Sequence, residues 1–130
     1  MPVLTVTPLY AGVLALLLVA LSLNVIRARL SARVSVGDGG DKGVIKSMRA
    51  QANCAEYAPM GLILLALTEL QGAPNWTLHL LGSTLLLGRL MHAYGFGRTP
   101  QIVPVRQLGM VLTFAMLIVA ALANIGHAVI

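Results

Sequence analysis

Four long apolar stretches separated by short polar segments dominate the pattern along this chain. They predict helices over residues about 7–30, 44–71, 75–96 and 104–129. An α-helix needs about 20 mostly apolar residues to cross a bilayer, and each stretch is long enough. No stretch shows the sustained period-two alternation of a lipid-facing barrel. The pattern therefore predicts an all-α membrane protein, a four-transmembrane-helix antiparallel bundle that forms one domain over residues 1–130.

The connections between these stretches are short. Residues 31–43 contain Val-Ser-Val-Gly-Asp-Gly-Gly-Asp-Lys-Gly, which predicts a flexible polar loop. Residues 71–74, Gln-Gly-Ala-Pro, predict a tight turn, and residues 95–104, with two prolines, predict a second longer turn. Short connections between long helices favour antiparallel neighbours.

Composition excludes most alternatives to a membrane protein. Hydrophobic residues make up 58% of the 130 residues and charged residues 10%, with a mean hydropathy of +0.86. Soluble domains contain roughly 25% charged residues. So few charges cannot cover the surface of a small soluble enzyme, and the high hydrophobicity excludes a disordered chain. Cys54 is the only cysteine, which excludes an internal disulfide.

The net charge of +5 reflects membrane orientation rather than nucleic-acid binding, because the basic residues flank the apolar stretches without forming an aromatic-interleaved stripe. All nine lie around the first and third connections: Arg27, Arg29, Arg33, Lys42, Lys46, Arg49, Arg89, Arg98 and Arg106. Basic loops stay in the cytoplasm. We therefore expect the first and third loops to be cytoplasmic and both termini to lie outside, as in a multi-pass inner-membrane protein.

Polar residues within the second predicted helix carry the clearest functional signal. Arg49, Asn53 and Glu56 stand at i, i+4 and i+7 and form one polar stripe, with Tyr57 at its edge and Gln51 on another side. Ions at membrane depth are costly and usually face a partner, a cavity or water. The stripe fits a ligand groove between helices, a contact between subunits, or a purely structural network in which the polar groups satisfy one another.

The third predicted helix adds a second polar line, formed by Arg89, His92 and Phe96. No second His or Cys has metal-ligand spacing with His92, so we expect no metal site. Several arginines near one membrane face favour carboxylates, phosphates or a thiolate, and Glu56 could receive an ammonium group. Together they suit a small zwitterionic ligand with extra negative charge, and an arginine beside a thiol would favour the nucleophilic thiolate.

The string Arg49-x-x-x-Asn53-x-x-Glu56-x-x-Pro59 resembles the signature of the MAPEG proteins, the membrane-associated proteins in eicosanoid and glutathione metabolism. The fuller string from Arg49 to Pro59 is similar to that of the leukotriene-forming synthases, and the chain also resembles microsomal glutathione transferases. The resemblance covers essentially the whole chain, including Arg89-Leu-Met-His92 and Arg106. Its compact length is typical of a bacterial member.

The resemblance implies a homotrimer that binds glutathione as co-substrate between subunits and joins it to lipophilic electrophiles from the lipid bilayer, or reduces lipid hydroperoxides. It implies a catalytic role for Arg106, as the residue that stabilises the thiolate. The implied glutathione-binding residues are Arg29, Arg49, Gln51, Asn53, Glu56, Tyr57, Arg89 and His92. The expected function is therefore a membrane glutathione transferase or peroxidase, with a role in detoxification.

Two departures from the family pattern keep alternatives open. Phe96 stands where relatives often have a tyrosine, and Leu30 stands where some have an arginine. Phe96, together with the placement of Arg106 close after Pro100 and Pro104, favours a second possibility, a non-catalytic membrane binding protein of the same family. A small multidrug transporter is a third, but such proteins typically carry a lone acidic residue deep in their first helix, and this chain has none there.

Overall fold

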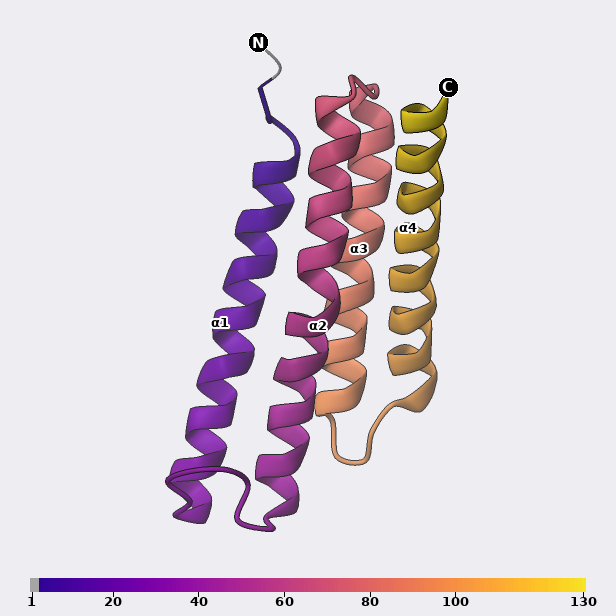
Figure 1. The fold of residues 1–130 in the computed structure, drawn as a ribbon. Helices are drawn as coiled ribbons and strands as arrows, with labels where there is room; N and C mark the ends of the chain where they lie inside the picture. Colours follow the sequence, from indigo (N-terminus) through magenta and orange to yellow (C-terminus); the bar gives the residue numbers. More distant parts are fainter. Residues whose placement is uncertain (1–2) are drawn as a thin grey trace.

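The protein is an antiparallel bundle of four α-helices in the computed structural model, which describes residues 3–130 (Figure 1). The helices are α1 (Thr7–Ala32), α2 (Lys42–Leu70), α3 (Asn75–Gly97) and α4 (Val103–Val129). Both ends of the chain lie beside the α2–α3 turn, and the other two connections lie together at the opposite end (Figure 1). The predicted all-α, four-helix class is confirmed, and each helix ends within two residues of its predicted bounds.

Local sequence chemistry sets several helix ends. Pro8 and Pro104 stand in the first turns of α1 and α4, where proline's missing N–H costs no helical hydrogen bond. Asp41 caps α2, because its carboxylate accepts a hydrogen bond of 2.9 Å from the Val44 N–H. Gly72 adopts a φ of +83° in the α2–α3 turn, a conformation that glycine reaches without strain.

A carboxylate near the end of α2 holds the start of α1. Glu69 Oε1 accepts hydrogen bonds from the backbone N–H groups of Thr5 (2.6 Å) and Val6 (2.7 Å), and Oε2 accepts one of 2.7 Å from Thr7. The first N–H groups of a helix have no partner within the helix, and the helix dipole favours a negative charge there. Glu69 therefore joins α1 to the bundle at the end that carries both termini.

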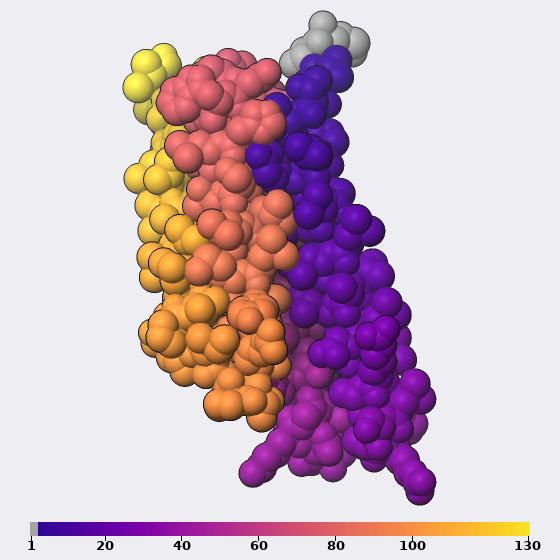
Figure 2. Space-filling model, turned by 180° about the vertical axis from the view of Figure 1, so that it is seen from behind, coloured from indigo at the N-terminus to yellow at the C-terminus, as the bar shows by residue number. Residues whose placement is uncertain are grey.

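The helices pack in two closely associated pairs. α1 lies chiefly along α2 and α3 along α4, while α2 also contacts α3 and α4. Within residues 3–130, α1 and α4 do not touch. Figure 2 shows α1 as a column at one edge, with α2 visible between it and the α3–α4 pair near the lower end. The buried core between the helices includes Leu14, Cys54, Leu65, Leu85 and Met116.

The outer surface of this bundle is suited to lipid. Large apolar side chains are exposed along every helix, as Leu16, Ile63, Leu80 and Ile118 illustrate. Within the described part of the chain, α1 and α4 are the helices long and apolar enough to cross a membrane by composition alone. α2 and α3 fall short of that composition because they carry the polar residues that the sequence analysis singled out.

Three glycines let α3 and α4 approach closely at the level of those polar residues. A Cβ placed on Gly88 would lie 2.8 Å from the backbone oxygen of Gly109, and one on Gly95 would lie 2.6 Å from the backbone nitrogen of Arg106. Small residues allow this backbone contact between membrane helices. The crossing fixes the position of the α3 segment that carries Arg89 and His92.

Candidate functional site

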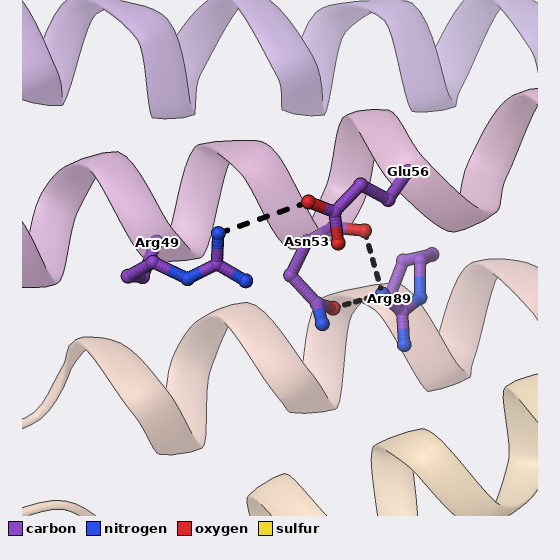
Figure 3. Close-up of polar contacts among 4 residues, drawn as sticks. All are labelled: Arg49, Asn53, Glu56 and Arg89. Carbon is purple, nitrogen blue, oxygen red and sulfur yellow. Dashed lines mark hydrogen bonds and ion pairs between the residues drawn. The ribbon is translucent and has the colours of Figure 1, made fainter.

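Arg49 and Glu56 form an ion pair on the outer face of α2. Their side chains stand two turns apart, and Nη1 of Arg49 lies 3.7 Å from Oε1 of Glu56 (Figure 3). The two side chains remain 57% and 52% exposed, so neither faces the interior of its own bundle. The predicted stripe is therefore present, and its charged members face out of the bundle, with Glu56 at the middle of the 29-residue α2 and Arg49 two turns before it.

Asn53 lies between these two residues along the helix but turns toward α3. Its side-chain Oδ1 accepts a hydrogen bond from Nη1 of Arg89, and its backbone oxygen lies 3.4 Å from the same nitrogen (Figure 3). The stripe thus joins an outward ion pair to an inward polar contact. Asn53 is the residue that connects the two.

Arg89 is the largest of the fully buried side chains, with 1% of its surface exposed. Nε donates a hydrogen bond of 3.0 Å to Oγ1 of Thr113, and Nη2 lies 3.2 Å from the sulfur of Met110, both on α4. Its guanidinium also lies 5.4 Å from the centre of the Tyr57 ring, a cation–π arrangement. Arg89 therefore connects three helices through its donors.

A second polar group forms at the basic end of the bundle, near the end of α3. His92 is buried and stacks on Phe96, with ring centres 5.6 Å apart and planes 13° apart. The Arg106 guanidinium lies 5.8 Å from the Phe96 ring, and its Nη1 donates a hydrogen bond of 2.8 Å to Gln101. Among residues 3–130, no hydrogen bond or ion pair joins Arg106 to the α2 stripe.

A pocket of about 370 Å³ opens along the seam between α1 and α2. Arg29, Arg49 and Gln51 line it together with Ser22 and Met48. The Arg29 Nε donates a hydrogen bond of 3.0 Å to the Gly37 oxygen in the first loop. Gln51 thus lies on a different side of α2 from Glu56, as its spacing predicts, and it shares its pocket with Arg29.

The structure therefore groups the predicted site residues in three places. The α2 stripe with its α3 neighbour contains Arg49, Asn53, Glu56, Tyr57 and Arg89. The α1–α2 pocket contains Arg29 and Gln51 and shares Arg49 with the stripe. The α3–α4 end contains His92 and Arg106. No trio of His, Cys, Asp or Glu suited to a metal ion occurs within the described residues.

Sequence reasoning missed Thr113 and Met110, the α4 partners of Arg89. Most of α4 is apolar, so its one threonine and the first of its two methionines carry no signal of a polar contact. Their distance of more than 20 residues from Arg89 becomes a contact only through the α3–α4 crossing.

Comparison with known proteins identifies the family. The profile of the MAPEG family matches residues 7–126, which include α1, α2 and α3 and most of α4. The chain belongs to the MAPEG family. It is also 40% identical over 122 residues to the inner membrane protein YecN of Escherichia coli K12, covering 94% of this chain and 92% of YecN. YecN of an Escherichia coli O6:H1 strain matches to the same extent. The resemblance seen in the α2 motif is confirmed, and this MAPEG chain is a membrane protein.

Proposed function

We propose that this MAPEG protein is a glutathione-dependent transferase or peroxidase of the bacterial inner membrane, acting on lipophilic electrophiles as a homotrimer. The observation that carries the proposal is the half-exposed Arg49–Glu56 pair on the outer face of α2. Two relatives named as inner membrane proteins support the location. The basic end of the bundle, with the first and third loops, then faces the cytoplasm, and both termini lie outside.

A pair of ions at this depth requires a polar neighbour, because hydrocarbon cannot solvate a carboxylate or guanidinium. A second copy of the chain, packed beside α2, would exclude lipid from the pair and enclose a crevice. Arg29 and Gln51 line the α1–α2 pocket, which Arg49 also lines, on another side of α2 from Glu56. In a closed ring of subunits each copy can offer one side to each neighbour.

Glutathione matches the charges of such a crevice. It carries two carboxylates and one ammonium group. Arg49 and Arg29 would bind carboxylates, and Glu56 would bind the ammonium group, so that the ligand replaces the internal Arg49–Glu56 pair with charge-assisted contacts of its own. Gln51, Asn53 and Tyr57 add neutral hydrogen-bonding groups around these ions.

The proposed chemistry starts with the glutathione thiol. A guanidinium stabilises the thiolate relative to the thiol, and the thiol proton passes to water. In conjugation, the sulfur lone pair forms a bond to the electrophilic carbon, and the leaving group departs with the electrons of the broken bond. In peroxide reduction, the thiolate sulfur attacks the terminal oxygen, the O–O bond breaks, and the alkoxide leaves and takes up a proton to give the alcohol. The sulfenic acid that forms reacts with the thiol of a second glutathione to give the disulfide and water. Arg106 is the proposed thiolate-stabilising residue.

Thiolate formation provides the direct test. Glutathione is added to the detergent-purified protein, and the ultraviolet absorbance of the thiolate is compared in wild type, Arg106→Ala and the matched control Arg98→Ala. Arg98 is a nearby arginine whose Nη2 donates to the Tyr94 hydroxyl. We expect the signal in wild type and in the control and its loss in Arg106→Ala. No thiolate signal in wild type would refute the activation step.

Calorimetry tests the binding site separately from turnover. Glu56→Gln removes the charge proposed to bind the ammonium group, and we expect at least a tenfold loss of glutathione affinity, or about 1.4 kcal/mol. Glu69→Gln is the matched control, because Glu69 lies at the C-terminal end of α2, away from the proposed site, and binds the start of α1. Equal affinity in the two variants would place the ligand elsewhere.

A non-catalytic binding protein is the second candidate. Phe96 offers no hydroxyl to a thiol, and Arg106 donates to Gln101 rather than to the α2 stripe. Glutathione binding without a thiolate signal, and without turnover on a panel of electrophiles and hydroperoxides, would favour this candidate over the enzyme.

A further inference from the structure

Arg89 is a buried cation without an acidic partner. Among residues 3–130, the ion pair within 4.0 Å is that of Arg49 and Glu56, and no carboxylate lies within that distance of Arg89. A buried charge of this kind is costly unless polar or aromatic groups surround it. Arg89 meets this need with a hydroxyl, an amide, a thioether and an aromatic ring.

These partners leave the guanidinium closed to a ligand. Arg89 is 1% exposed, and its contacts come from both α2 and α4. It therefore influences the crevice through the residues that it holds. Asn53 and Tyr57 are those residues, and both belong to the α2 motif.

The hydrogen bond between Arg89 and Asn53 can form in one direction only, with Arg89 as donor and Asn53 as acceptor. A guanidinium has five N–H donors and no acceptor, whereas a side-chain amide has one acceptor end and one donor end. Arg89 must therefore face Oδ1 of Asn53, and the Nδ2 group turns away from it. Within the described residues, Nδ2 makes no hydrogen bond and is not among the fully buried unpaired atoms.

We propose that Arg89 is a positioning residue that fixes the Asn53 amide so that Nδ2 is presented to the crevice as a hydrogen-bond donor. The group it selects is an oxygen acceptor, a carboxylate or an amide carbonyl of a peptide-like ligand. Without Arg89 the amide could rotate and offer Oδ1 instead. The identity of the ligand as glutathione rests on the proposed function, whereas the orientation of Asn53 does not.

The substitution Asn53→Asp separates this role from a structural one. Aspartate has nearly the same shape, keeps an oxygen toward Arg89 and gives that cation a carboxylate partner, but it replaces the outward donor with an acceptor. We expect a higher midpoint of thermal unfolding in detergent together with at least a tenfold weaker binding of glutathione by calorimetry. The loss should persist at 1 M salt, where screening weakens general repulsion between the new charge and an anionic ligand.

The same substitution in an Arg89→Met background tests the pairing. With no guanidinium to receive it, the new carboxylate should give no rise in the unfolding midpoint. Arg89→Lys provides a second background if the methionine variant does not fold, and the rise should return there in part. An equal shift of the midpoint with and without a cation at this position would overturn the Arg89–Asn53 orientation.

The outcomes for binding are distinct from those for folding. If Asn53→Asp binds glutathione as tightly as the wild type, Nδ2 of Asn53 does not donate a hydrogen bond to the ligand, and this part of the proposal is overturned even if the variant is more stable. Absence of glutathione binding by the wild type would refute the proposed function and the ligand part of this inference, while the unfolding midpoints would still decide the orientation.

Discussion

Adding one methyl group at the α3–α4 crossing should destabilise the protein. In Gly109→Ala, the new Cβ would lie 2.6 Å from the Gly88 oxygen and 2.6 Å from the His92 nitrogen. Both are backbone atoms, so no side chain can rotate away to make room. The two helices must separate, or their backbones must distort.

The size of the effect follows from the distance to be recovered. Ordinary contact begins near 3.4 Å, so the helices must move apart by about 0.8 Å at this point. Overpacking of this kind costs about 1–3 kcal/mol. The movement also stretches the 3.0 Å hydrogen bond between Arg89 and Thr113, which crosses the same contact four residues along α4. We therefore expect the free energy of unfolding to decrease by an amount near the upper end of that range.

The measurement is unfolding by titration with a denaturing detergent, followed by circular dichroism of the purified protein. Gly126→Ala is the matched control, since it makes the same substitution in α4 at a position with nothing within 4 Å of the new Cβ. The control should change stability by less than about 1 kcal/mol, in the stabilising direction that helix propensity favours. Equal stability of Gly109→Ala and Gly126→Ala would refute the close crossing.

Three further predictions concern the end of the bundle that carries the termini. Glu69→Ala should cost about 1–2 kcal/mol in the same titration, because the N–H groups at residues 5–7 lose their acceptor, and wild-type stability would contradict this cap. Asn124→Leu should cost about 0.6–1.7 kcal/mol, because the buried amide donates a hydrogen bond of 2.9 Å to Thr68, and a more stable variant would show that this bond contributes nothing. Trp76, the only tryptophan, is exposed at the start of α3 and should lie at the membrane interface. Its fluorescence in vesicles should be quenched more by lipids brominated near the headgroup than by lipids brominated near the chain end. The reverse order would place Trp76 deeper in the bilayer and contradict this prediction.

Helix positions were predictable here because one physical requirement determines them. A helix must hide its backbone polar groups in lipid, so the apolar stretches and the breaks between them are visible in composition alone. The outward stripe was predictable for a related reason, since positions i and i+7 share a face of any α-helix. Arg49 and Glu56 accordingly form an ion pair.

The direction of each side chain toward another helix could not be read from the sequence. Asn53 shares the stripe by spacing, yet it pairs with Arg89 because the α2–α3 packing places that guanidinium beside it. The partners of Arg89 on α4 depend in turn on the approach permitted by Gly88 and Gly109. Such contacts arise from three helices at once, whereas periodicity describes one helix at a time.

The polar groups of the site differ in how readily they can exchange partners. Arg49 and Glu56 are half exposed, so a ligand that offers both charges can replace their mutual contact without depriving another group inside the bundle of its partner. Arg89 differs, because any ligand that drew it out would leave Thr113 and Asn53 without their donor inside the bundle. Changes at the outer pair should therefore alter ligand affinity with little effect on folding. Changes at Arg89 should alter folding first, and affinity through the orientation of Asn53.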